Sequence, residues 1–294
     1  MRLLRALEMG IAQEMRGVLV LALLLQVEGF GYGGAVDGAV FPLSLPRQQV
    51  SGMLPEGLEL NSTAATHPVL LTFCVQLHVG APFTHFNYDE FIITVPFVQW
   101  DNVRAAGKKY RGPFSYLPHL YLNETAPVQL GRLWVGDDKE LGTIVHEEDE
   151  HGSGSFRVTG AKGHAYEGTS IVEAAWVAAG DEANATAWGG FQTNFAAGYN
   201  LPSLGQYPKG SGKWKCLPQN YHTADIATLR PIAGSVNVHQ PFLGAGALPV
   251  GNFSFSPMTR DVSSRGAFRI STSWQYTSLK SDCDAFDPEA VHTA

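Results

Sequence analysis

Two apolar runs in the first third of the chain set the expected architecture. The segments Val69–Val79 and Phe91–Val98 alternate weakly between apolar and polar positions, and both are rich in β-branched and aromatic residues. Such residues suit a pleated, half-buried surface, so we expect two neighbouring strands of one sheet. A third run of this kind is Tyr116–Leu122. Further strands are expected at Phe41–Leu45, Phe156–Val158, Ile171–Val177 and Phe191–Phe195.

Helical periodicity is scarce by comparison. The segment Pro46–Met53 predicts one or two helical turns, and Leu54–Leu60 predicts a turn that leads into an extended segment. The 294 residues include 32 glycines and 17 prolines, and 11% of them are aromatic, which favours many short strands joined by tight turns. The fold class we expect is mainly β (α+β), in one domain.

Composition also narrows the function. With 45% hydrophobic residues the chain can bury a substantial core, and a net charge of −7 does not suggest a nucleic-acid partner. The apolar stretch Val18–Val27 is too short for a stable membrane span and has the length of a signal-peptide core. Met15 and Arg16 stand directly before it, and cleavage is expected within Gly29–Ala35. The alternative is a buried N-terminal helix, because Glu8 and Glu14 are unusual before a signal core.

The chain therefore divides into a targeting segment (1–34), a single domain (35–280) and a polar, frayed tail (281–294). Four Asn-x-Ser/Thr triplets favour a glycoprotein of the secretory pathway or the extracellular space, namely those at Asn61, Asn123, Asn184 and Asn252. The three cysteines leave one unpaired even if a disulfide forms. Cys74 lies in an apolar strand pattern, which is typical of a buried free thiol.

The most informative stretch for chemistry is Gly131–Gly142, GRLWVGDDKELG, in which Lys139 has apolar residues on both sides. An amine that is stripped of water favours its neutral form and becomes a nucleophile able to form an imine. The alternative is that Lys139 is a solvated surface cation in a charged turn. A second candidate is Glu90, which with Tyr88 and Asp89 opens the Phe91–Val98 strand. A glutamate that points into a cavity would have a raised pKa and could handle a proton.

Two other polar segments are expected to be structural. The run His146–His151, HEEDEH, predicts a solvated loop, and it lacks the i, i+4 histidine pair of a helical zinc motif. Whether its acids bind a metal stays open. The segment Tyr207–Lys215, YPKGSGKWK, is not a phosphate-binding loop, because Trp214 stands where such a loop needs serine or threonine. Since the segment is basic and rich in glycine, we expect an exposed hairpin tip.

Taken in order, these motifs resemble the acetoacetate decarboxylase family. LPEGLEL is followed by a strand, then by Tyr88-Asp89-Glu90, then by Tyr121-Leu122, then by Gly131-Arg132 with a lysine eight residues after the glycine. Later, PQNY at 218–221 and LPV at 248–250 resemble the family's Pro-Asn-Tyr and Leu-Pro-Val segments. The resemblance covers roughly Phe41–Val250 and rests on order and spacing, since each motif is short.

The resemblance implies an antiparallel β-barrel or cone with small peripheral helices, and often an oligomer. It places the imine-forming lysine on Lys139 and the proton-handling glutamate on Glu90. Tyr88, Tyr121 and Arg132 are then the candidate substrate-binding residues, with Arg132 also fixing the backbone near the site. Neither a metal nor an organic cofactor is required. The reaction is a lysine-imine lyase reaction on a small keto acid or related carbonyl compound, or an aldol-type condensation and dehydration with the same lysine.

Two departures from the family pattern bear on the substrate and the amine. The family's Pro-Lys-Lys is Asp138-Lys139-Glu140 here, and acidic neighbours hold a lysine protonated. If these acids and Asp137 face solvent, burial still predicts a depressed pKa for Lys139. The family's carboxylate-binding arginine is absent from Gly34–Val40, which argues against acetoacetate as the substrate. The rival hypothesis is a non-catalytic secreted barrel that binds a small apolar ligand.

Overall fold

The computed structural model describes residues 32–81, 84–132, 136–164, 166–206, 214–223, 227–241, 248–276 and 283. Three predicted features lie wholly or partly outside these residues: residues 1–31 of the predicted targeting segment (1–34), Leu133–Val135 before the lysine, and residues 207–213 of the predicted hairpin tip. The strands are β1 (Tyr32–Pro46), β2 (Leu58–Leu60), β3 (Thr66–Ala81), β4 (Thr84–Trp100), β5 (Phe114–Leu122), β6 (Lys139–Glu148), β7 (Gly154–Gly160), β8 (Ser170–Ala178), β9 (Ala183–Asn184), β10 (Ser203–Gln206), β11 (Trp214–Leu217), β12 (Gln219–Tyr221), β13 (Thr228–Val238), β14 (Gly251–Phe255) and β15 (Phe268–Tyr276). The helices are α2 (Arg47–Ser51), α3 (Thr125–Leu130), α4 (Gly189–Asn194) and α5 (Ala196–Tyr199), with a 3₁₀ turn, η2 (Ala185–Ala187).

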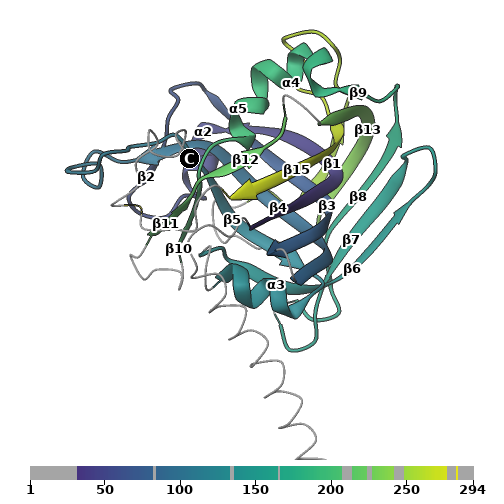
Figure 1. Ribbon diagram of the computed structural model, residues 1–294, viewed down its shortest axis with the longest axis horizontal. Helices are drawn as coiled ribbons and strands as arrows, with labels where there is room; N and C mark the ends of the chain where they lie inside the picture. Colours follow the sequence, from purple (N-terminus) through teal and green to yellow (C-terminus); the bar gives the residue numbers. More distant parts are fainter. Residues whose placement is uncertain are drawn as a thin grey trace, which may run out of the picture.

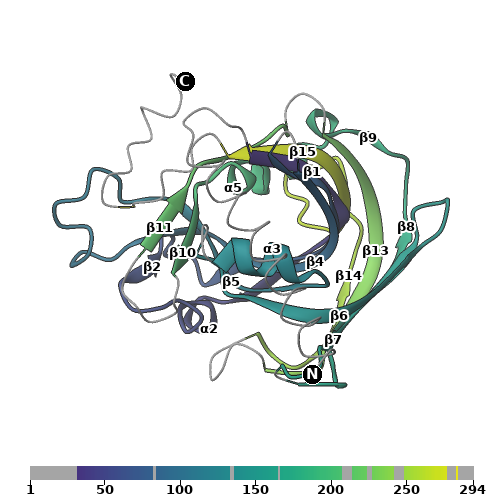
Figure 2. The same ribbon diagram turned by 60° about the horizontal axis from the view of Figure 1, so that its bottom comes forward.

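Most of the strands form a closed barrel. The order β5-β6-β7-β8-β13-β15-β1-β3-β4 is a continuous path, and the pairing of β4 with β5 closes it into a ring (Figures 1 and 2). Closure removes the unpaired edges that would otherwise invite association through strand pairing. The expected mainly β barrel with small peripheral helices is therefore confirmed, as is the pairing of the first two predicted strands, β3 and β4.

One pairing of the ring is not antiparallel. β5 and β6 run parallel, with Leu120 opposite Lys139 and Leu122 opposite Leu141. A parallel pair needs a crossover connection, and α3 provides it between the two strands. Figure 1 shows α3 beside the start of β6. The crossover therefore brings Lys139 to the middle of the sheet.

The strands around the site are buried on both faces, which explains why their alternation is weak in the sequence. In β3, Leu71 and Phe73 belong to an aromatic core in which Phe73 lies 4.7 Å from Phe91 and 5.5 Å from Phe156, measured between ring centroids. Gln76, on the opposite face of β3, lines cavities instead. We call these the core face and the cavity face.

Three local predictions are corrected. Phe191–Phe195 is helical, in α4 and its C-cap, because phenylalanines four residues apart share one helix face; both rings pack on Phe268, at 5.4 and 5.5 Å. His146 and the two glutamates that follow it are not in a loop but end β6, where the His146 ring packs 5.3 Å from Phe156. The turn begins at Asp149. The first strand begins at Tyr32, three residues before the predicted domain boundary.

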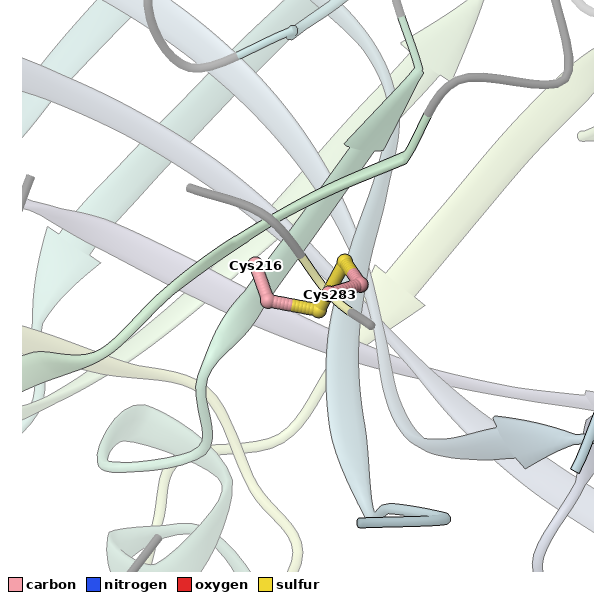
Figure 3. Close-up of a disulfide and its surroundings, with 2 residues drawn as sticks. All are labelled: Cys216 and Cys283. Carbon is pink, nitrogen blue, oxygen red and sulfur yellow. A yellow bond between two sulfur atoms is a disulfide. The ribbon is translucent and has the colours of Figure 1, made fainter. Parts of the chain in front are cut away.

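The C-terminal part of the chain is tied to the barrel by a disulfide. Cys283 is buried and bonded to Cys216 of β11 (Figure 3). The frayed tail predicted for 281–294 is therefore wrong at Cys283, and the other residues of that tail lie outside the described part of the chain. Cys74 is a buried free thiol, as expected.

Candidate active site

Lys139 is the first residue of β6 and is only 8% exposed. Its backbone is held by Arg132, whose Nε donates a hydrogen bond to the Lys139 carbonyl at 2.6 Å. Its side chain passes close over Gly131, where a Cβ atom would stand 2.4 Å from the lysine Cε. The absence of a side chain at Gly131 therefore gives Lys139 its path into the cavity face.

Two carboxylates flank the amine. Lys139 Nζ lies 3.4 Å from Glu90 Oε1 and 3.7 Å from Asp137 Oδ2, and both acids are almost fully buried. Two hydrogen bonds orient Glu90 on the side away from the amine. Gln76 Nε2 donates to Glu90 Oε2 at 3.1 Å, and Trp274 Nε1 donates to Gln76 Oε1 at 3.0 Å. The chain Trp274, Gln76, Glu90, Lys139 thus fixes the acid against the amine across strands β15, β3, β4 and β6.

These groups line a cavity of about 50 Å³. We call it the reactive cavity. Two buried oxygens in its wall, Asp137 Oδ1 and Ser203 Oγ, have no hydrogen-bond partner among the described residues. Unpaired buried oxygens are costly, so they mark positions where a bound ligand is favoured. The wall consists of Gln76, Tyr88, Glu90, Ile92, Leu117, Leu120, Asp137, Lys139, Ser203, Gln219, Tyr221, Trp274 and Tyr276.

The charge state of the amine differs from the prediction. Burial by itself lowers the pKa of Lys139, as expected, but the negative charges of Glu90 and Asp137 outweigh it and raise the pKa above its ordinary value of 10.5. The predicted depressed pKa of Lys139 is therefore wrong. The reason is the pair of carboxylates, first Glu90 and then Asp137, and Asp137 was expected to face solvent but faces the amine instead.

Asp137 has a raised pKa that suits proton transfer near neutral pH. Burial raises its pKa to about 6, although the nearby Lys139 charge opposes the shift. A carboxyl with this pKa changes protonation state close to neutral pH, which suits a proton acceptor or donor. Burial also raises the pKa of Tyr32 to about 12 and that of Tyr276 well above its ordinary value, so both phenols stay neutral near the site.

The sequence was compared with known proteins. No protein-family model matches it, and no curated protein matches it. Solved structures do match the fold. The enduracididine biosynthesis enzyme MppR, in its complex with pyruvate, superposes with a TM-score of 0.56 at 11% identity, over 84% of this chain and 87% of that one. An acetoacetate decarboxylase from Legionella pneumophila superposes with a TM-score of 0.55 at 13% identity, over 86% of each chain.

A third match is an acetoacetate decarboxylase-like enzyme from Sphingomonas wittichii, with a TM-score of 0.53 at 11% identity, over 87% of this chain and 93% of that one. This chain has the acetoacetate decarboxylase-like fold. At such low identities the likeness establishes architecture, and the chemistry has to be argued from the site.

Within this acetoacetate decarboxylase-like fold, the structure places the predicted residues on two different faces. Lys139, Glu90 and Tyr88 line the reactive cavity. Tyr121 does not: it belongs to the core face, with its ring 4.7 Å from that of His119. Substrate contact by Tyr121 stays a prediction, and this position gives it no support. Arg132 is bound to the Lys139 backbone, the positioning role considered for it.

The two acids adjacent to Lys139 in sequence point away from the amine. Asp138 Oδ2 lies 3.6 Å from His119 Nδ1, and Glu140 Oε2 lies 3.9 Å from His119 Nε2. Extended backbone sends successive side chains to opposite faces, so residues 138 and 140 share one face while 137 and 139 share the other. That same alternation was the signal that would have placed Asp137 beside Lys139.

Other cavity residues had no local signal in the sequence. Gln76 lies 14 positions before Glu90 and Trp274 lies 198 positions after Gln76. Tyr221 and Tyr276 come from β12 and β15, which pair with each other. Among the described residues, no group of three or more histidines, cysteines or acids is arranged to hold a metal ion, and no helix is long and apolar enough to cross a membrane.

Proposed function

We propose that this protein is a Schiff-base enzyme in which Lys139 forms an imine with a small ketone or aldehyde and a carbon–carbon bond beside the imine is then made or broken. The observation that carries the proposal is the buried Lys139 amine, 3.4 Å from Glu90 and 3.7 Å from Asp137 at the wall of a cavity. A lone surface lysine would have neither the confinement nor the proton acceptors.

The first step is the loss of a proton from the amine. Asp137, with a pKa of about 6, is largely ionised at neutral pH, and its Oδ2 is close enough to take the proton from Lys139 Nζ. The free lone pair then adds to the carbonyl carbon. The carbonyl oxygen gains two protons, one from the lysine nitrogen and one from the protonated Asp137, and leaves as water, so that a protonated imine remains on Lys139. A ligand that displaces water from the cavity also strengthens the effect of burial on the amine.

The protonated imine withdraws electrons from the adjacent carbon. A proton on that carbon passes to a base as the bonding pair moves toward nitrogen and forms an enamine. Glu90 is the base that the geometry supports, because Gln76 holds its second oxygen while Oε1 faces the amine. The enamine carbon then attacks the carbonyl carbon of a second molecule, and the reverse sequence cleaves the same bond.

Of the two reactions that the resemblance implies, the site favours the aldol-type condensation over decarboxylation of a keto acid. Lys139 is the only cation among the described residues that line the reactive cavity, and two carboxylates already face it. A substrate carboxylate would meet these charges without a partner, which is costly in a buried site. One structural relative, MppR, has been solved with the condensation product of pyruvate and imidazole 4-carboxaldehyde, which supports condensation as the reaction type; the argument against a substrate carboxylate rests on the charges of this site alone.

Reductive trapping tests the proposal. The protein is incubated with acetone, pyruvate and a small aldehyde, then reduced with sodium borohydride, and the modified residue is mapped by peptide mass spectrometry. We expect an adduct on Lys139 that is lost in Lys139→Arg, which keeps the charge, and retained in Lys162→Arg, a surface control. An adduct that persists in Lys139→Arg, or no adduct on Lys139 with any carbonyl compound, would overturn the proposal.

A ligand-binding barrel without catalysis is the second candidate. It is supported by the charged state of Lys139 between its two carboxylates, which makes the amine a salt-bridge partner rather than a nucleophile. The trapping experiment separates the two functions, because a carrier binds carbonyl compounds without becoming covalently labelled.

We also propose the secretory route and a homo-oligomer for this protein. The Cys216–Cys283 disulfide supports the first, because such bonds persist in oxidising compartments. N-terminal mass analysis of protein from its native source tests it: a first residue within 29–35 is expected, and an intact Met1 or Met15 would count against cleavage. Light scattering coupled to size-exclusion chromatography tests the oligomer.

A further inference from the structure

A second cavity adjoins the reactive one. Its volume is about 60 Å³. The two cavities share five wall residues: Gln76, Ile92, Leu117, Gln219 and Tyr221. We call it the arm cavity, because it extends from the reactive cavity along the same face of the sheet. A molecule whose carbonyl carbon is bound to Lys139 can therefore extend along these shared residues from the reactive cavity into the arm cavity.

The arm cavity has a different chemical character. The wall of the arm cavity exposes mostly apolar surface, to which Val36, Leu70 and Ile270 contribute, and no described residue that lines it is an acid or has a basic side chain. Its polar atoms are neutral hydroxyl and amide groups. A charged group placed there would lose its water without gaining an opposite charge, whereas a hydrocarbon group would lose unfavourable contact with water.

One polar atom in this wall also indicates a ligand. The Tyr199 hydroxyl is buried and has no hydrogen-bond partner among the described residues, and its ring lies 5.3 Å from that of Tyr221, one of the shared wall residues. Tyr199 is held in place from α5, since its carbonyl accepts a hydrogen bond from Gln219 Nε2 at 3.5 Å. A buried hydroxyl without a partner favours a bound molecule that carries one neutral hydrogen-bonding atom close to it, on an otherwise apolar substituent.

We propose that the arm cavity binds an uncharged, mainly hydrocarbon substituent of the substrate whose carbonyl group reacts at Lys139. The inference rests on the proposed function and deepens it: the substrate class is ketones or aldehydes with a neutral apolar arm, not short keto acids. The apolar wall of the arm cavity binds the substituent, and Lys139 with its two carboxylates binds the carbonyl group.

Matched probes distinguish the inference from the proposed function. Acetone carries the ketone alone, benzylacetone adds an aromatic hydrocarbon arm, and levulinate adds a carboxylate arm. The probe concentration for half-maximal borohydride labelling of Lys139 is measured for each. We expect the value for benzylacetone to be at least tenfold lower than that for acetone, and the value for levulinate to be no lower than that for acetone.

Filling the arm cavity supplies a second test. Ile270 lines the arm cavity and not the reactive cavity, so Ile270→Phe is expected to reduce the advantage of benzylacetone over acetone to less than threefold. Val177→Phe adds the same ring on an exposed strand position and is expected to keep the advantage. Should Ile270→Phe fail to fold, as judged from its thermal unfolding, Thr94→Leu narrows the same cavity from β4.

Each outcome has a definite meaning. Equal labelling by levulinate and benzylacetone, or an advantage that survives both filled variants, overturns the arm cavity while the labelled lysine upholds the Schiff-base function. If no probe labels Lys139, the Schiff-base function fails and this inference, which rests on it, is rejected with it.

Discussion

The Lys139 amine and the Glu90 carboxylate lie 3.4 Å apart although 49 residues separate them in the chain. β5 lies between their strands and pairs with both, antiparallel to β4 and parallel to β6. The two side chains meet on the cavity face because Glu90 lies opposite Leu122 and Lys139 opposite Leu120, two residues of β5 that are two positions apart and so share one face. The parallel crossover through α3 is thus the feature of the fold that assembles the candidate site.

Replacing Glu90 with glutamine tests whether its negative charge raises the pKa of Lys139. Glu90→Gln removes a negative charge that stabilises the protonated lysine, so the pKa of Lys139 falls and the neutral fraction at a given pH rises. We expect the pH of half-maximal borohydride labelling to shift downward by about one unit or more. Turnover is expected to fall by about a hundredfold or more, since the variant lacks the proposed base.

The control for this variant is Glu59→Gln, which removes a surface carboxylate that is paired with Arg111. It is expected to leave the labelling profile unchanged. An unchanged profile in Glu90→Gln as well would show that Glu90 does not set the charge state of Lys139.

Asp137 should make stability depend on pH in an unusual direction. Its folded-state pKa of about 6 is above its ordinary value of 3.8, so its protonated form favours folding and its ionised form opposes it. This contribution is fully favourable below pH 4 and is lost as the pH rises through 6. We expect Asp137→Asn to gain stability relative to the unmodified protein between pH 4 and pH 7, by at most about 3 kcal/mol.

Urea unfolding at several pH values measures this difference. A gain that is constant across the range, or that shrinks as the pH rises, would contradict the raised pKa. In the unmodified protein the labelling rate is expected to rise near pH 6, as Asp137 ionises and can take a proton from Lys139. Asp137→Asn is expected to lose this rise, because asparagine cannot take the proton.

The sequence could predict much of the fold but not all of it, and the reasons are local. β3, β4 and β5 were predictable because β-branched and aromatic residues fill both of their faces. Most of β1 was not, because its glycines suggest turns. In the structure, Gly38 lies so close to β3 that a Cβ atom would stand 2.4 Å from that of Cys74, so glycine there permits close packing within a strand.

The candidate site was predictable only in part for a related reason. Lys139 and Glu90 follow from the order and spacing of motifs, and Asp137 follows from strand alternation. Trp274 and Tyr276 reach the cavity because β15 pairs with β1 and β12, at the far end of the chain. No local pattern in residues 268–276 indicates that pairing.

Gly131 offers a test of how the lysine is positioned. A methyl group at this position would stand 2.4 Å from Lys139 Cε and 2.9 Å from Nζ, so Gly131→Ala forces the flexible end of the lysine to move. The backbone at Gly131 is helical, which alanine adopts readily. We therefore expect labelling of Lys139 to slow by about tenfold or more through misplacement of the amine, with little change in the thermal midpoint. Labelling at the original rate would show that the Lys139 side chain accommodates the added methyl group without displacing its amine.

The disulfide is expected to contribute substantially to stability. Cys216 and Cys283 are 67 residues apart, and closing a loop of that length stabilises the folded state by about 4 kcal/mol in the chain-entropy account. The double variant Cys216→Ala/Cys283→Ala should unfold at lower urea concentration by a corresponding amount. Cys74→Ala removes a thiol outside the disulfide and serves as the cavity-forming comparison. Equal stability of the double variant and the unmodified protein would mean that the bond does not form in solution.

Among the four predicted glycosylation triplets, the structure sets one apart. The Asn123 side-chain amide donates to Asp89 Oδ2 at 2.8 Å, and its carbonyl oxygen accepts from the Asp89 backbone N–H at 3.0 Å, so its amide nitrogen is engaged in the fold. Asn61, Asn184 and Asn252 are exposed. In protein from a secretory host we expect glycans at these three positions and an unmodified Asn123, as mapped by peptide mass spectrometry before and after enzymatic deglycosylation. Full occupancy at Asn123 would contradict this expectation, because the amide nitrogen that would carry the glycan donates to Asp89 in the folded protein.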